Sequence, residues 1–337
     1  MPPSSRTPPL LEPFVRTPRD DSLLLLTSTL GASANWLIAR FLGEALRSPG
    51  ASDDNDDNDD DDQHGGAKNV LLVSWMRDHD FWKQEARRGA GLDLSNLRTQ
   101  GRFAFVDGLS ALFLDNDNDN EQREAPRTRA PPAAAHTLPT RGPPPPGRTP
   151  ASAPSRPPPP SHTLSSASLA HLDATLSSAL AALRPAHKTL VILDNPDVLL
   201  ATAASAPALT HSALTAFFLA LHARDTVSHL LVHLQSDTAL LAASSAAAAA
   251  SATPPQALQV AQRNLVVQTA HMSRVVLGTR VLDTGVARDV SGVLRRTVNA
   301  AAASSWEKEG DADAEGREVL YKVHADGGVK VFERGAE

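Results

Sequence analysis

The sequence predicts an α/β domain with a mainly parallel sheet, flanked by helices and finished by antiparallel C-terminal hairpins. Four segments contain a continuous apolar run: "LLLLT" (23–27), "NVLLVSW" (69–75), "KTLVILDNPD" (188–197) and "SHLLVHLQSD" (228–237). Strands without polar alternation are typical of a sheet buried on both faces. Segments of helical periodicity lie between them, and the last third of the chain turns to alternating, glycine-punctuated strands.

The N-terminal half alternates strand and helix. After the strand at 23–27, residues 31–33 form a turn, and a helix follows until "RSPG". The strand at 69–75 precedes a polar helix through "FWKQEARRG", and "GRFAFVDG" (101–108) is a third strand bounded by glycines. The helix after the first turn is predicted from apolar residues at helical spacing, namely Ala34, Leu37, Ile38, Phe41 and Ala45.

The second half continues the alternation. A helix within 164–184 ends at Pro185 and precedes the strand at 188–197, and a further helix precedes the strand at 228–237. The apolar faces of these two helices comprise Leu169, Leu172, Leu176, Leu180 and Leu183 in the first, and Leu214, Phe217, Phe218 and Leu221 in the second.

The C-terminal third predicts antiparallel strand pairs. "SRVVLGTRVLDTG", "VARDVSGVLRRTV" and "EVLYKVHADGGVKVFERG" carry turns at Ser291-Gly292 and at residues 326–328. Tight hairpins favour glycine because it adopts positive φ at no steric cost. Val319, Tyr321 and Val323 recur at every second position, as do Val329 and Val331, so one side of this sheet is buried.

We predict one domain over residues 21–337, preceded by a disordered tail at 1–20 and interrupted by two disordered inserts. The first insert, 51–66, holds the acidic tract "DDNDDNDDDD", and the second, 115–162, is rich in Pro, Ala, Ser and Arg. Neither has enough apolar surface to offset the entropy of ordering. Both fall between predicted core elements, where long loops cost little.

Composition excludes several classes of function. The net charge is −6, but eight aspartates lie in the acidic tract, so the remainder is close to neutral and indicates no strongly charged partner. The absence of cysteine excludes disulfides, thiolate metal sites and Cys nucleophiles. No stretch resembles a signal peptide or a membrane span, so we expect a cytoplasmic or nuclear protein.

The first strand, turn and helix have the layout of a phosphate-binding loop without its chemistry. Such a loop uses glycines to bring backbone N–H groups to the phosphates, a lysine to bind them and a Ser/Thr hydroxyl to hold magnesium. Here the G-K-[ST] triplet becomes Gly31-Ala32-Ser33, and the first glycine of the pattern falls on Leu26. An alanine supplies no charge for phosphoryl transfer, so we expect no competent ATPase site and no bound cofactor.

Two other residues occupy positions typical of nucleotide sites. Asp194 ends an apolar strand, where a Walker-B aspartate would lie, although "DNPD" is equally a good turn. Gln235 lies where RecA-like folds carry a sensor residue, although an ordinary loop glutamine fits too. Ser33 is most simply a helix N-cap. We therefore interpret Gly31, Ala32, Ser33, Asp194 and Gln235 as vestigial nucleotide-site positions and assign no catalytic residue.

Other chemical motifs are weak. "DHD" (78–80) places a histidine between carboxylates, but no second cluster completes a metal shell, so no metal is predicted. The basic pairs Arg87-Arg88 and Arg295-Arg296 are candidate contacts to tRNA or to a protein partner, although solvated arginines are commoner.

Several segments together resemble a known family. "VSWMRDHDFWKQEARRGAGLDLSNLRTQGRFAFVDGLSALF", "SHLLVHLQSD", "RVLDTGVARDVSGVLRRT" and "EVLYKVHADGGVKVFERG" are similar to the sixth subunit of the Elongator complex in a fungal form. The resemblance covers most of the chain outside the tail and the inserts. It implies a RecA-like ATPase fold without the usual nucleotide motifs, so a degenerate Walker A motif at Ala32 would be a family trait.

The same resemblance implies a function in tRNA processing. Members assemble with the fourth and fifth Elongator subunits into a heterohexameric ring, which joins the catalytic Elongator subcomplex in modifying tRNA wobble uridines. The ring binds tRNA and regulates its release, and ATP turnover is assigned to the assembled ring. Two alternatives remain open: an independent NTPase of the RecA/KaiC type with a degenerate loop, and a recombination-mediator paralogue that binds single-stranded DNA.

Overall fold

The computed structural model describes residues 7–18, 21–47, 68–113, 162–202, 209–241, 256–285, 287–299 and 316–333. The strands of these segments form one 10-stranded sheet in the order β10-β9-β8-β7-β1-β6-β5-β2-β3-β4. The acidic insert and nearly all of the Pro-rich insert lie outside the described residues, so their predicted disorder stays a prediction.

Parallel pairing runs from β7 to β4, and antiparallel pairing joins β7 to β8, β8 to β9 and β9 to β10. The strands are β1 Ser22–Ser28, β2 Asn69–Ser74, β3 Phe103–Asp107, β4 His162–Thr163, β5 Thr189–Asp194, β6 Val227–Gln235, β7 Val275–Arg280, β8 Gly292–Val298, β9 Arg317–Val323 and β10 Val329–Glu333. In this order β6 lies between β1, which precedes the degenerate loop, and β5, which ends in Asp194. The predicted α/β fold with a RecA-like core is confirmed.

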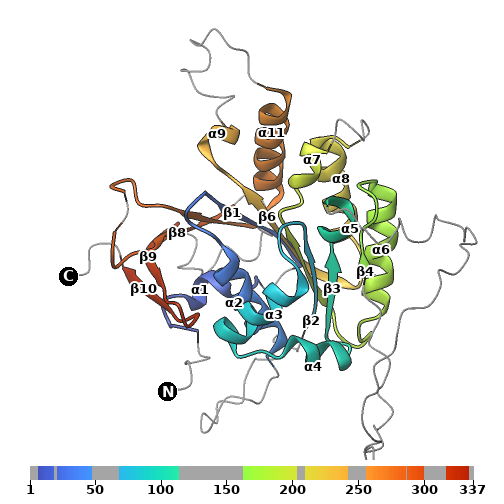
Figure 1. Cartoon of the computed structure of the whole chain (residues 1–337), viewed down its shortest axis with the longest axis horizontal. Helices are drawn as coiled ribbons and strands as arrows, with labels where there is room; N and C mark the ends of the chain where they lie inside the picture. Colours follow the sequence, from blue (N-terminus) through green and yellow to red (C-terminus); the bar gives the residue numbers. More distant parts are fainter. Residues whose placement is uncertain are drawn as a thin grey trace, which may run out of the picture.

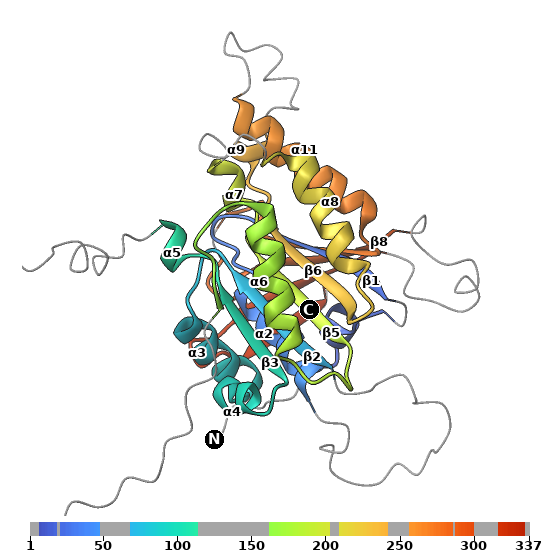
Figure 2. The ribbon, with the colours of Figure 1, turned by 90° about the vertical axis from the view of Figure 1, so that its right-hand side faces the viewer.

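Helices cover both faces of the parallel part (Figures 1 and 2). One face carries α1 Glu12–Val15, α2 Asn35–Leu46, α3 His79–Ala90 and α4 Leu94–Thr99; the other carries α6 Leu169–Ala181, α7 Val198–Ala201, α8 His211–His222 and α11 Ala257–Met272. The short helices α5 Ser110–Phe113 and α9 Thr238–Leu241 follow β3 and β6.

Each face has its own hydrophobic core, because alternate residues of a strand point to opposite sides. In β1, Leu24 and Leu26 join the core beneath α2, whereas Leu23 and Leu25 join the core beneath α6, α8 and α11. The apolar runs of the sequence therefore fill both layers.

Three details differ from the prediction. Part of the predicted N-terminal tail is structured, since α1 buries Phe14 and Val15 beside α2. The helix α11 was not predicted. The first C-terminal segment forms β7, which pairs antiparallel with β8 as expected but also pairs in parallel with β1.

The predicted turn at Ser291-Gly292 is wrong, whereas the turn at residues 326–328 is confirmed. Gly292 is the first residue of β8, and a side chain there would lie 2.6 Å from the Arg280 carbonyl oxygen. Close approach, not positive φ, explains this glycine. Gly327 has φ +83° in the β9–β10 turn and lies against the backbone of Arg88. None of the described helices is long and apolar enough to cross a membrane.

Candidate functional site

The loop after β1 is a small turn rather than a wide phosphate-binding loop. The Ala32 backbone N–H donates to the Thr29 carbonyl oxygen at 2.9 Å, and Gly31 between them has φ +87°. The hydroxyl of Thr279 on β7 donates to the Ala32 carbonyl oxygen at 2.7 Å. Ala32 is only 2 % exposed, so its side chain points into the protein where a phosphate-binding lysine would need to reach outward.

Ser33 does not cap α2, which corrects the prediction. The N-cap residue is Ala34, and no side chain caps the helix there. The Ser33 hydroxyl instead accepts a hydrogen bond from the Asn35 backbone N–H at 3.3 Å. A residue just after β6 also holds the loop, because the Leu30 backbone N–H donates to the Asp237 carboxylate at 2.6 Å.

Asp194 ends β5 at the carboxyl edge of the sheet, and both of its carboxylate oxygens are occupied. The Ser74 hydroxyl, from the end of β2, donates to Oδ2 at 2.6 Å. The His233 ring, from β6, meets Oδ1 through Nδ1 at 2.8 Å. Asp194 is fully buried, so this carboxylate has no oxygen directed at solvent for a hydrated magnesium ion.

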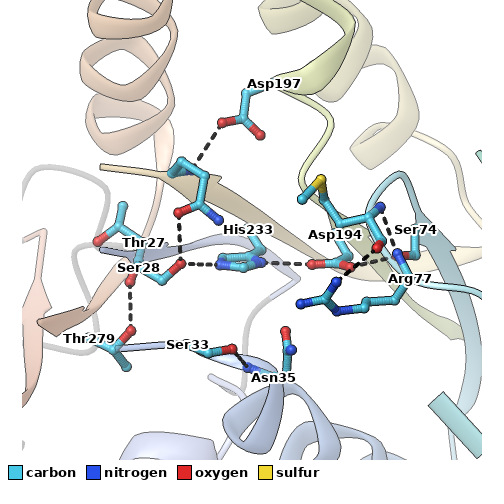
Figure 3. Close-up of polar contacts among 12 residues, drawn as sticks. Thr27, Ser28, Ser33, Asn35, Ser74, Arg77, Asp194, Asp197, His233 and Thr279 are labelled. Atoms are coloured by element: carbon cyan, nitrogen blue, oxygen red, sulfur yellow. Dashed lines mark hydrogen bonds and ion pairs between the residues drawn. The ribbon is translucent and has the colours of Figure 1, made fainter. Parts of the chain in front are cut away.

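The same hydrogen-bonded chain continues to β1. The Ser28 hydroxyl lies 2.8 Å from His233 Nε2 and donates to Gln235 Oε1 at 3.3 Å. Residues 28, 74, 194, 233 and 235 thus form a continuous polar row across β1, β6, β5 and β2, which we call the polar row (Figure 3). Ser28 and His233 are each 2 % exposed.

The parallel register creates this row. Ser74 pairs with Asp194, Asp194 pairs with His233, and Ser28 pairs with Gln235, so all these side chains project from one face of the sheet. Because the groups satisfy one another, they are tolerated in an interior that otherwise penalises polar atoms.

A second buried carboxylate, that of Asp197, is hydrogen-bonded to the polar row at Gln235. Asp197 Oδ2 accepts the Gln235 backbone N–H at 3.0 Å and the Gln262 side-chain amide at 2.7 Å. Its other oxygen has no partner among the described residues. Burial raises the pKa of Asp197, and the two hydrogen bonds oppose that rise.

The structure brings together part of the predicted site. Asp194 and Gln235 belong to the polar row, whereas Gly31, Ala32 and Ser33 lie in the neighbouring turn without a contact to Asp194 among those described. Sequence reasoning missed Ser28, Ser74 and His233. The available indication was that each is a polar residue near the carboxyl end of an otherwise apolar strand.

The four candidate arginines lie on other elements. Arg87 and Arg88 are exposed in the last turn of α3, where the helix dipole favours cations. Arg295 is exposed on β8, and Arg296 is half-buried on its opposite side. Asp78 caps α3 by accepting the Phe81 backbone N–H, and no group of three potential metal ligands occurs among the described residues.

Comparisons with known proteins add little beyond this geometry. No family model matches the chain, and no curated protein matches it. Among solved structures, it is similar to an uncharacterized protein from Pyrococcus horikoshii, crystallised in complex with an unknown peptide. The identity is 10 %, the TM-score is 0.46 and the match covers 97 % of each chain. The fold assignment therefore rests on the strand order.

Proposed function

We propose that this chain is a non-catalytic, RecA-like subunit of the Elongator accessory ring, acting in the cytoplasm or nucleus. In this role it assembles with the fourth and fifth Elongator subunits and supports tRNA binding and release during wobble uridine modification. The sequence resemblance supplies the family. The hydrogen bonds of Asp194 support the non-catalytic role, because Ser74 and His233 occupy the carboxylate that would otherwise hold magnesium.

The two hydrogen bonds of Asp194 also make magnesium binding at this site unfavourable. To receive a magnesium ion, Asp194 would have to exchange two close hydrogen bonds in a dry environment for metal-bound water. The loop adds no compensating cation, since Ala32 stands at the lysine position. Losing this electrostatic contribution removes most of what the protein does in phosphoryl transfer.

Co-purification is the decisive experiment. A tagged full-length chain, expressed in its native host, should recover the fourth and fifth Elongator subunits, and native mass spectrometry should give a heterohexamer. Recovery of the chain as a self-sufficient monomer, without either subunit, would refute the proposal.

Calorimetric titration of the isolated full-length chain with Mg-ATP separates the subunit role from an independent NTPase. We expect neither binding heat nor hydrolysis, because the site lacks its cation and its free carboxylate. Tight binding with turnover by the isolated chain would favour the NTPase instead. If the isolated chain neither binds nor hydrolyses Mg-ATP, any ATP turnover of the assembled ring resides in the partner subunits.

A further inference from the structure

The antiparallel end of the sheet presents a face that no described helix covers. On β8, β9 and β10, the residues that alternate with those of the α2 core lie on the opposite face of the sheet. We call this the open face; it comprises Arg295, Thr297, Leu320, Lys322, Lys330 and Phe332. Arg295, Thr297, Lys330 and Phe332 are exposed, and the other two are half-buried.

The strand register arranges residues of the open face, together with the buried Val293 and the half-buried Glu318 on the same side of the sheet, in three cross-strand rows. Val293, Leu320 and Phe332 form an apolar row that ends in the Phe332 ring on the edge strand, which is 40 % exposed. Lys322 and Lys330 form the next row on one side, two residues along each strand. On the other side, Arg295 pairs with Glu318. Rows two residues apart are separated by about 7 Å.

The lysine row is electrostatically unfavourable by itself. Lys322 and Lys330 lie directly opposite each other, and like charges in that position destabilise a sheet. Glu318 does not neutralise these lysines, because its carboxylate ion-pairs with Arg280 of β7 at 3.4 Å. The Lys322 ammonium donates to the Arg288 carbonyl oxygen, a neutral group, and no ion pair of Lys322 or Lys330 occurs among the described residues. An anion placed over this row would remove the repulsion.

The exposed Phe332 ring, with lysines and an arginine in the neighbouring rows, offers the contacts by which proteins bind unpaired RNA. Unpaired bases stack on aromatic side chains presented by a sheet, and flanking lysines or arginines contact the phosphates. We propose that the open face binds an unpaired segment of RNA, with a base on Phe332 and phosphates on Lys322, Lys330 and Arg295. This inference rests on the proposed function, in which tRNA is the RNA.

Fluorescence anisotropy with labelled tRNA, at several salt concentrations, tests the inference in the full-length chain and in its purified complex. The variant Lys322→Gln/Lys330→Gln should bind more weakly, and its salt slope should fall by about 1.4, or about 0.7 for each lost phosphate contact. Phe332→Leu keeps an apolar side chain but removes the ring. It should lower affinity about 5- to 100-fold with an unchanged salt slope, since stacking is not ionic.

Matched variants on α3 provide the controls. Lys83→Gln removes an exposed lysine on α3, away from the open face, and should leave the affinity and the salt slope unchanged. If Arg87→Gln/Arg88→Gln lowers the affinity and salt slope while the open-face variants do not, RNA binds on α3 and the inference is overturned. Circular dichroism of each variant verifies that it is folded.

The outcomes also separate this inference from the proposed function. If the open-face variants still bind tRNA normally within an intact ring, the inference fails and the subunit role stands. If those variants lose a ring subunit but not RNA, the face is a protein interface and the inference fails. A wild-type chain that neither joins the ring nor binds RNA contradicts both.

Discussion

Two polar regions of one sheet differ in how their charges are used. In the polar row, each buried group has a partner from a neighbouring strand, and Asp194 is held from both sides. On the open face, Lys322 lies opposite another lysine, and Phe332 lies exposed beside them. A buried group must be satisfied within the protein, which leaves nothing for a ligand, whereas an exposed mismatch is tolerated by water and can be relieved by a partner.

The largest expected effect comes from breaking the polar row. His233→Leu should destabilise the protein by about 3–5 kcal/mol, because Asp194 stays buried without its charged or polar neighbour. Urea denaturation monitored by circular dichroism measures this loss. His324→Leu, on an exposed turn, serves as the matched control and should change stability by less than about 0.5 kcal/mol.

A double-mutant cycle sharpens that result. Adding Asp194→Asn to His233→Leu should recover part of the lost stability, since the amide carries no charge to bury. Strictly additive losses from the two substitutions would show that the two side chains do not interact.

A buried histidine at the opposite end of β6 should make stability depend on pH. Burial and the nearby Lys68 ammonium lower the pKa of His229 to about 4, and its Nε2 lies 2.9 Å from the Pro18 carbonyl oxygen. Between pH 4 and about 6.5 the unfolded chain binds a proton that the folded chain does not, so stability is lost as pH falls through this window. The loss amounts to at most about 3 kcal/mol at pH 4.

The variant His229→Gln keeps a donor for Pro18 but removes the titration. Its unfolding free energy should fall less steeply between pH 6.5 and pH 4 than that of the wild type. Some slope should remain, because burial also lowers the pKa of His79, His162 and His222. Identical pH profiles for variant and wild type would contradict the assignment.

A smaller change, in this case no loss or a gain in stability, is expected when Asp197 is replaced. Burial raises the pKa of this carboxyl group, so its contribution to stability is lost as pH rises through the folded-state value. Asp197→Asn retains an acceptor for Gln235 and Gln262 without a charge, and at pH 7 it should be neutral or stabilising by up to about 1 kcal/mol. Thermal unfolding at pH 7 decides this, and a large loss would mean that the ionised form is required.

The smallest expected effect on stability comes from changing the lysine pair on the open face. Lys330→Glu replaces the like-charged pair by an opposite one and should stabilise the fold by about 0.2–1 kcal/mol, while weakening RNA binding. The double variant Lys322→Glu/Lys330→Glu restores repulsion and should return stability to the wild-type value. A single variant less stable than wild type would show that the lysine pair carries no electrostatic cost.

Some elements could not be predicted from local patterns. The helix α11 buries Gln262 and Thr269 while Val260 and Val267 are 39 % and 45 % exposed, which is the reverse of an amphipathic pattern. Gln262 is buried because Asp197 and the Gln235 carbonyl oxygen need its amide, a requirement created by residues far away in sequence. Similarly, Gly292 is required by its approach to Arg280 across the sheet, which no local turn rule detects.

The sequence alone determined the alternation of buried strands and helices, the missing lysine at Ala32 and the turn at Gly327, because hydrophobic periodicity, side-chain charge and positive φ are local properties. Only the tertiary structure decided that Ser28, His233, Asp194 and Ser74 join across four strands and that Lys322 faces Lys330. Strand order and register set those contacts, since they bring together residues that are distant along the chain.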